Sequence, residues 1–244
     1  TLPIAFLAGA LAGMVTGLLN TALGIPGILA SILTQISLYS INLNIMGKAN
    51  QPVSVDNYPL VVSLRYVTDG SVSRLLFFLG MIVFLLALIA VMYWYFGTEQ
   101  GHAIRATGCN GNMARAQGIN TNFIKVLALM ISNGLVGLCG ALYGQFQGAS
   151  DVNMGRGAIV IGLAAVIIGE VLFGKFASKR KLAFAFTLAS VILGAVIYYM
   201  VYQFVLWLKM PSEDMKLFSA IVVAIFLAIP YLKEKRTLRK GASK

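Results

Sequence analysis

Charged side chains are scarce in this sequence. Only 11% of its 244 residues are charged, whereas an ordinary soluble domain carries about 25%. Hydrophobic residues make up 59%, and the mean hydropathy is +0.84. So few charges leave too little polar surface for a soluble enzyme of this size. The composition therefore predicts an all-α integral membrane protein, a polytopic helical bundle.

Cysteine and histidine are almost absent. Cys109 and Cys139 are the only cysteines, and they are too far apart to indicate a metal site or a disulfide framework. His102 is the only histidine and has no neighbouring carboxylate or nucleophile, which favours a solvated interfacial side chain over a catalytic one. No phosphate-binding loop, dinucleotide fingerprint or H-E-x-x-H motif occurs. We therefore expect no catalytic residue, no metal site and no cofactor on this chain.

Acidic residues are also few, with 8 Asp and Glu against 19 Lys and Arg. In a soluble protein this excess would suggest a nucleic-acid partner, but no basic stripe interleaved with aromatic residues accompanies it. Cytoplasmic loops of membrane proteins are rich in Lys and Arg, because the insertion machinery and anionic lipids favour positive charge on that side. The charge therefore predicts a lipid bilayer as partner and no nucleic acid.

Long apolar runs predict about seven spans in this chain, since one span takes roughly 20 residues. The expected spans are residues 1–20, 25–46, 75–96, 123–147, 158–174, 182–208 and 217–232. The run 158–174 is short and forms either a short helix or a broken segment. We expect a permease domain over 1–232 and a basic tail over 233–244. Because the chain begins at Thr1 without a methionine, we also expect sequence upstream.

Lys and Arg are most numerous in the tail, the 175–181 link and the 97–122 loop once acidic residues are balanced against them. The positive-inside rule places these three segments in the cytoplasm. With seven spans, Thr1 then lies outside, together with the connections 47–74 and 148–156.

Small and polar residues inside the spans predict two kinds of surface. Gly9, Gly13 and Gly17 recur every four residues, which predicts a close-packing helix face. Amides and phenols cost too much free energy to face lipid, so those within spans need water or a partner. The candidates for a translocation path are Gln35, Tyr39, Asn42, Gln145 and Gln147. Alternatively, the amides in the second half of the span 25–46 hydrogen-bond neighbouring helices, at about 1 kcal/mol each.

The 97–122 loop contains a complete short helix in the run NGNMARAQG at 110–118. Asn110 stands at the N-cap, helix-forming residues follow, and Gly118 stands just after the last turn. A helix of two turns is not stable alone, so it must dock on its own bundle or on a cytoplasmic partner.

Two stretches resemble a known family. The run 105–174 and the run PGILASILTQISLYSINLNIMGKAN at 26–50 resemble permease subunits of ABC importers that work with an extracellular binding protein. The broad family includes branched-chain amino acid and ribose permeases, and a bacterial subgroup labelled uncharacterised or tryptophan-type is more similar still. The resemblance implies the ABC importer permease fold, with a coupling helix around 112–118 seated on a separate ATPase subunit. The residues it assigns to ATPase coupling are Arg105, Asn112, Met113, Ala114, Arg115, Gly118 and Ile119. Glu170 matches a family glutamate and is the gating candidate, with an interfacial carboxylate as the alternative.

The resemblance also implies function and partners. The chain would be the transmembrane subunit of an importer in the bacterial cytoplasmic (inner) membrane, paired with itself or a sister permease. An extracellular or periplasmic solute-binding protein would deliver a small solute, and the subgroup suggests a hydrophobic or aromatic amino acid. ATP and Mg²⁺ would bind only the ATPase, so the chain itself is no enzyme. The alternatives are an ATP-independent facilitator or channel for small polar solutes, and a membrane scaffold.

Overall fold

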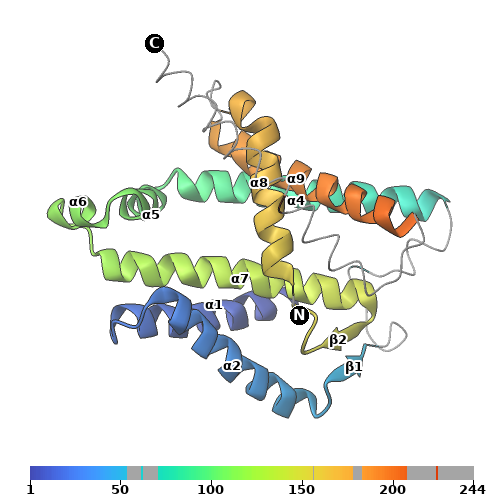
Figure 1. The fold of residues 1–244 in the computed structure, drawn as a ribbon, viewed down its shortest axis with the longest axis horizontal. Coiled ribbons are helices and arrows are strands. Elements are labelled where there is room, and N and C mark those ends of the chain that lie inside the picture. The colour runs from blue at the N-terminus through green and yellow to red at the C-terminus, as the bar shows by residue number, and fades with distance from the viewer. Residues whose placement is uncertain (54–61, 63–70, 156, 178–182, 208–223, 225–244) are drawn as a thin grey trace. The chain divides into compact units, whose positions relative to one another are not determined.

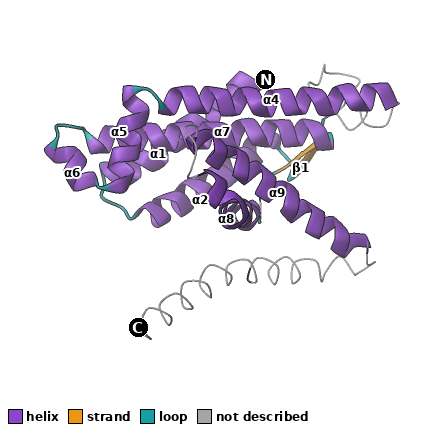
Figure 2. Ribbon diagram, turned by 90° about the horizontal axis from the view of Figure 1, so that it is seen from above, coloured by secondary structure: helices purple, strands orange, loops and turns teal. Residues whose placement is uncertain are grey.

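The computed structural model describes residues 1–53, 62, 71–155, 157–177, 183–207 and 224. Contacts divide the chain into two compact units, Thr1–Gly155 and Arg156–Lys244, which are described separately. The expected permease domain over 1–232 therefore includes the first unit and most of the second, to which the expected tail 233–244 also belongs. The described elements are helices apart from two short strands (Figures 1 and 2).

The first unit contains six helices and both strands among its described residues. The helices are α1 (Leu2–Thr21), α2 (Gly27–Met46), α4 (Ser71–Phe96), α5 (Glu99–Cys109), α6 (Gly111–Ala116) and α7 (Thr121–Gln147). The strands are β1 (Asn50–Pro52) and β2 (Ala149–Asp151). Gly47 and Gly148, both with φ of 68°, end α2 and α7 in the left-handed conformation that glycine adopts without steric cost. Each of these glycines leads into one of the strands.

The glycines of α1 pack directly on the backbone of α7. A Cβ on Gly17 would lie 2.9 Å from Cα of Val126, and one on Gly13 would lie 2.9 Å from Cα of Met130. Gly9 meets the backbone of α7 in the same way, further toward its C-terminal end. The two helices are therefore antiparallel and in backbone contact, as small residues permit in membranes. The predicted close-packing face is confirmed.

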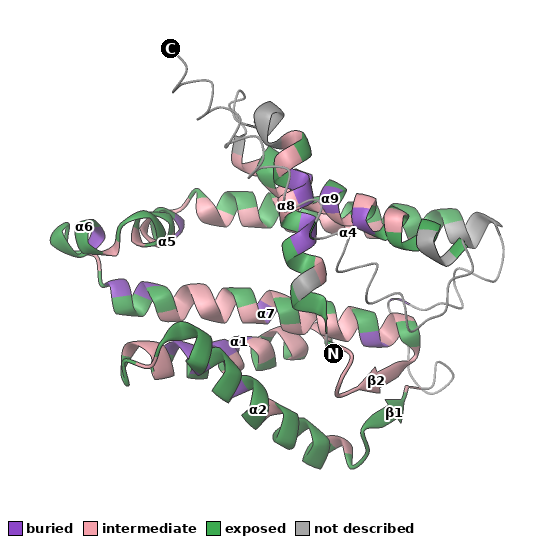
Figure 3. Ribbon diagram, viewed as in Figure 1, coloured by how far each residue is buried: buried purple, intermediate pink, exposed green. Residues whose placement is uncertain are grey.

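Helix α2 is attached to α1 through few side chains. The hydroxyl of Thr16 donates to Oγ1 of Thr34 over 2.9 Å, and both residues are buried. Asn20 closes the turn between the helices by donating from Nδ2 to the carbonyl of Ile25 over 2.8 Å. Apart from Ala30 and Thr34, the residues of α2 are exposed or half-buried within this chain, as Figure 3 shows.

The two strands join the ends of α2 and α7. They pair antiparallel, with Gln51 opposite Ser150. Gln145 also donates from Nε2 to Oγ1 of Thr1 over 3.4 Å, which places the start of α1 at this end. The connections 47–74 and 148–156 therefore begin on one side, in line with their predicted placement together. Residues 54–61 and 63–70 of the first connection lie outside the described residues.

The second unit contains α8 (Ala158–Ala177) and α9 (Ala183–Trp207). Glycines again allow close contact, since a Cβ on Gly194 would lie 3.0 Å from Cα of Gly169. The buried core of this pair is Ala164, Ile168 and Tyr198. α8 is one continuous helix of 20 residues, so the alternative of a broken segment at 158–174 is wrong. The helix continues past the predicted end at Gly174 to Ala177, because the lysine that follows Gly174 is itself a good helix former.

Five helices are long and apolar enough to cross a membrane: Leu2–Thr21, Gly27–Met46, Leu75–Phe96, Thr121–Gln147 and Phe184–Phe204. The apolar part of α8, Ile161–Phe173, is shorter. Six of the seven predicted spans thus coincide with helices. The seventh, 217–232, lies outside the described residues except for Ala224, as does the whole of the tail.

Candidate functional site

The predicted short helix is present as α6, and both of its predicted caps are formed. The side-chain Oδ1 of Asn110 accepts hydrogen bonds from the backbone N–H groups of Asn112 and Met113, each over 3.1 Å. Gly118 has φ of 86° and donates to the carbonyl of Arg115, while Ile119 donates to that of Ala114. This pair of bonds is a Schellman motif, which satisfies the last carbonyls of the helix. Local hydrogen bonds therefore fix both ends of α6.

One face of α6 is docked on the chain itself. Ala114 is only 2% exposed, and α6 contacts both α5 and α7. Nη2 of Arg115 donates to Oγ1 of Thr121, over 3.2 Å, and Thr121 is also 2% exposed. Ala114 therefore packs α6 against the rest of the chain, and its buried side chain is not part of the surface that a partner could touch.

The opposite face of α6 is open. Met113 is 59% exposed, and the other exposed residues here are Asn112, Arg115, Ala116, Gln117 and Gly118, with Ile119 half-buried. A flexible, polarisable methionine at the centre of such a patch suits contact with another protein. We call these residues with Met113 the α6 outer face.

Helix α5 was not predicted from the sequence. Thr98 caps it by accepting from the N–H of Gly101, and Glu99 occupies its first turn. These are start signals that could have revealed it. A Cβ on Gly101 would lie 2.7 Å from the carbonyl carbon of Phe96, so only glycine permits the tight turn from α4. Arg105 is exposed on α5 and therefore lies on a different helix from the other predicted coupling residues, and its coupling role stays a prediction.

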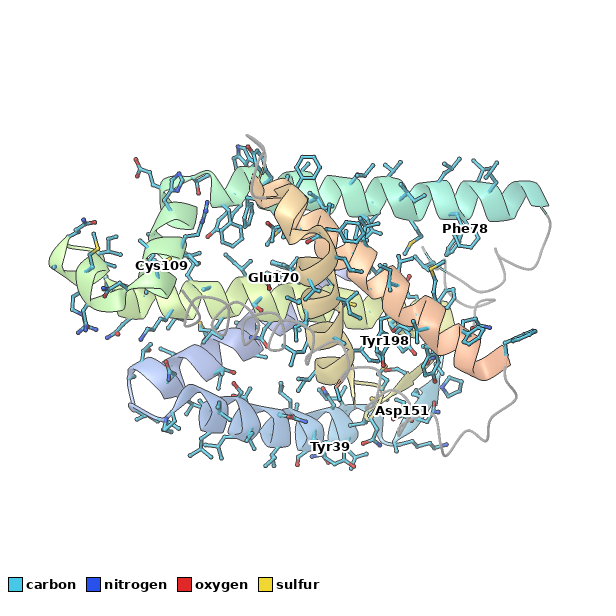
Figure 4. All side chains as sticks on the ribbon, turned by 45° about the horizontal axis from the view of Figure 1, so that its top comes forward. Tyr39, Phe78, Cys109, Asp151, Glu170 and Tyr198 are labelled. Atoms are coloured by element: carbon cyan, nitrogen blue, oxygen red, sulfur yellow. The ribbon has the colours of Figure 1, made fainter. Side chains whose placement is uncertain are left out.

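Three of the predicted path residues share α2. Gln35, Tyr39 and Asn42 follow helical spacing and are all exposed within this chain; Figure 4 labels Tyr39. The other two lie on α7, where Gln147 donates from Nε2 to the hydroxyl of Tyr143 over 2.7 Å and Gln145 reaches Thr1. The structure thus distributes the predicted residues over two helices whose ends meet at the β1–β2 pair.

Sequence reasoning found only Gln147 of an exposed face of α7 that carries several polar side chains. The helix turns one face, with Gly134 and Gly137, toward α1. The opposite face is exposed and contains Ser132, Val136, Cys139, Tyr143 and Gln147. Their spacing of three and four residues was the signal that could have found them.

Glu170 is exposed on α8, two residues from the fully buried Ile168 and so on a different face (Figure 4). No ion pair of its carboxylate occurs among the described residues, and its gating role stays a prediction. Within the same described ranges, no group of three or more His, Cys, Asp or Glu side chains could hold a metal ion.

A family model described as the permease component of a branched-chain amino acid transport system matches residues 1–230. The chain belongs to this permease family. The predicted resemblance is therefore confirmed, and with it the fold class of a polytopic helical membrane protein.

Individual proteins are also similar to this chain. A tyrosine transport system permease protein of Clostridioides difficile (strain R20291) is 40% identical over 92% of this chain and 70% of its own length. An uncharacterised protein of Rickettsia prowazekii (strain Madrid E) is 29% identical over 92% of the chain and 76% of its own length. An autoinducer 2 import system permease protein of Yersinia pseudotuberculosis is 27% identical over 85% of this chain and 55% of its own length. No solved structure matches the chain.

Family membership gives the chain its general role. It is a multi-pass membrane protein of the ABC permease class, a transport subunit. In such a subunit the α6 outer face and the polar faces of α2 and α7 are the candidate functional surfaces, because packing among the described residues of the first unit leaves them exposed.

Proposed function

We propose that this chain is the transmembrane subunit of an ATP-driven importer in the bacterial cytoplasmic membrane, and that a separate ATPase subunit drives it. The observation that carries the proposal is α6. A helix of six residues is capped at both ends and docked through Ala114, yet the described residues of the first unit leave its outer face around Met113 exposed. The caps and the docking hold this short helix rigid, and a rigid exposed helix suits binding to a partner.

The proposed cycle needs partners on both sides of the membrane. A solute-binding protein delivers solute at the end where α1 begins and the β1–β2 pair lies, and the ATPase binds ATP and Mg²⁺ at the α5–α6 end. Two permease chains, identical or paired, form the path between them. Movement of the ATPase shifts α6 and switches the permease between outward-open and inward-open states.

The proposed solute is a hydrophobic or aromatic amino acid. The tyrosine transport permease supports this class because it is 40% identical over most of both chains. The path itself is proposed to follow Gln35, Tyr39 and Asn42 on α2 together with the α7 residues Ser132, Tyr143, Gln145 and Gln147. These side chains are polar and uncharged, and Lys125 near the start of α7 is the one charged residue of α1, α2 and α7. Such a path suits a solute without net charge.

The decisive experiment disrupts the α6 outer face in the full-length transporter. Met113→Glu places a carboxylate at the centre of the proposed ATPase interface, and we expect binding of the ATPase to weaken at least tenfold, which is about 1.4 kcal/mol. Arg115→Ala and Gly118→Val should likewise abolish ATPase association and uptake of L-tyrosine. Lys48→Glu, an exposed charge change at the opposite end of the unit, is the matched control and should leave association unchanged.

The same assay separates the alternatives. Uptake that persists without any ATPase would identify a facilitator. A chain that transports nothing under any condition, with or without the ATPase, would be a scaffold.

A further inference from the structure

One polar contact ties the proposed coupling helix to the transmembrane part of the first unit. Nη2 of Arg115 donates to Oγ1 of Thr121 over 3.2 Å, and Thr121 stands in the first turn of α7. Thr121 is 2% exposed, so its hydroxyl is removed from the surface that meets a partner. Arg115 therefore belongs to the α6 outer face and at the same time touches α7.

The connection between α6 and α7 turns at Gly118. This glycine is in the left-handed conformation, and a Cβ there would meet no atom of the described residues within 4 Å. The bond from Arg115 to Thr121 bridges this turn, and a hydrogen bond from a charged donor is stronger than a neutral one. Together with the packing of Ala114, it holds α6 at its tilt on α7.

Beyond Thr121, α7 and α1 form one rigid body. Gly13 and Gly17 bring the backbone of α1 against that of α7, and the aromatic ring of Phe6 packs on Gly134, where a Cβ would lie 2.8 Å from the ring. Contacts this close leave no free volume, so a displacement of one helix displaces the other. By contrast, α2 is held to α1 by the buried Thr16–Thr34 bond and by the turn at Asn20.

We infer that Thr121 is a positioning residue through which movement of α6 becomes movement of the α1–α7 pair. This inference rests on the proposed function, since it assumes that an ATPase moves α6. Without the hydroxyl, α6 tilts about Gly118, and the movement that the ATPase imposes on α6 is not passed on to α1 and α7. ATP is then hydrolysed without solute uptake.

The test uses the complete transporter, with its ATPase and its binding protein, in proteoliposomes. Thr121→Val keeps the shape of the side chain and removes the hydroxyl, whereas Thr121→Ser keeps the hydroxyl. For Thr121→Val we expect ATPase association and ATP hydrolysis within twofold of wild type, and uptake of L-tyrosine lower by at least tenfold. The ATP consumed per solute therefore rises at least fivefold, and Thr121→Ser restores it.

A matched control is available in α1. Thr21 also has a half-buried hydroxyl, but it donates only to the Gly17 carbonyl of its own helix, over 2.8 Å. Thr21→Val should leave the ratio of ATP to solute unchanged. This control separates the loss of a bridging hydroxyl from the general effect of a threonine-to-valine change.

Each outcome decides between the two proposals. A wild-type ratio in Thr121→Val overturns the inference and leaves the proposed function standing, while a wild-type permease that binds no ATPase overturns the proposed function. If Thr121→Val does not reach the membrane, Thr121→Ala gives the answer, because it also removes the hydroxyl and is smaller than valine. A wild-type ratio in that variant overturns the inference.

Discussion

At the scale of single residues, the glycines of α1 mark where two backbones meet. A Cβ on Gly13 would lie 2.9 Å from Cα of Met130, and the neighbouring atom is backbone, which cannot rotate away. On α4, by contrast, a Cβ on Gly80 meets no atom within 4 Å. Two glycines in apolar helices thus have opposite roles, and the four-residue glycine repeat that includes Gly13 and that Gly80 lacks is the sequence feature that distinguishes them.

This contrast gives a prediction for stability. Gly13→Ala should destabilise the protein by about 1–3 kcal/mol, because overpacking forces α1 away from α7. Gly80→Ala is the matched control and should change stability by less than about 0.5 kcal/mol. The measurement is the thermal unfolding midpoint of the full-length protein in detergent. Equal midpoints for the two variants would show that the α1–α7 contact is looser than described.

At the scale of elements, α2 has two faces with different roles. Thr34 is 6% exposed and bonds Thr16, whereas the next residue, Gln35, is exposed with Tyr39 and Asn42. The amides on the open face either line the path or hydrogen-bond another helix. Adjacent positions on the same helix allow these two roles to be separated.

We therefore predict different outcomes for the two positions. Thr34→Val removes a buried interhelical hydrogen bond and should lower stability by about 0.6–1.7 kcal/mol. Gln35→Leu and Asn42→Leu should leave the unfolding midpoint unchanged and lower the uptake rate at least fivefold, with the ATPase still bound. If the leucine variants instead lose stability and keep their uptake rate, the amides hold helices together and do not line the path.

The ends of helix α6 are set by local residues, whereas its orientation is not. Its two caps use only residues within 110–119. The side of α6 that faces the bundle depends on where α5 and α7 provide a surface for Ala114. This is why the helix could be predicted and the buried role of Ala114 could not.

At the scale of the molecule, the helices of the first unit have their ends grouped in two places. Thr1, the end of α2 and the end of α7 lie together at the β1–β2 pair, while α5 and α6 lie at the other end. Figure 4 shows Cys109 and Asp151 at these opposite ends. The positive-inside rule assigns the α5–α6 end to the cytoplasm.

The two exposed cysteines make this orientation testable. In a Cys139→Ser variant, Cys109 remains as the only thiol, and a membrane-impermeant maleimide should label it in inside-out vesicles and not in intact cells. A Lys48→Cys change in a chain without Cys109 and Cys139 should show the reverse pattern, since Lys48 is exposed just beyond α2. Labelling of Cys109 from outside the cell would invert the orientation and exclude an ATPase at α6.

Much of this protein was determined by its sequence alone. The apolar runs predicted the helices, Asn110 and Gly118 predicted the limits of α6, the spacing of Gly9, Gly13 and Gly17 predicted a packing face, and two stretches identified the family. These features depend on residues a few positions apart, within one helix or one turn, so they can be read along the chain.

Only the tertiary structure decided which surfaces meet. It paired the glycines of α1 with α7, joined β1 to β2 although neither three-residue strand has a recognisable pattern, and brought Arg115 to Thr121. It also turned Ala114 inward and left Met113 outside. These choices depend on contacts between segments far apart in the chain, where many apolar faces are compatible and the closest fit of backbone and side chains selects one.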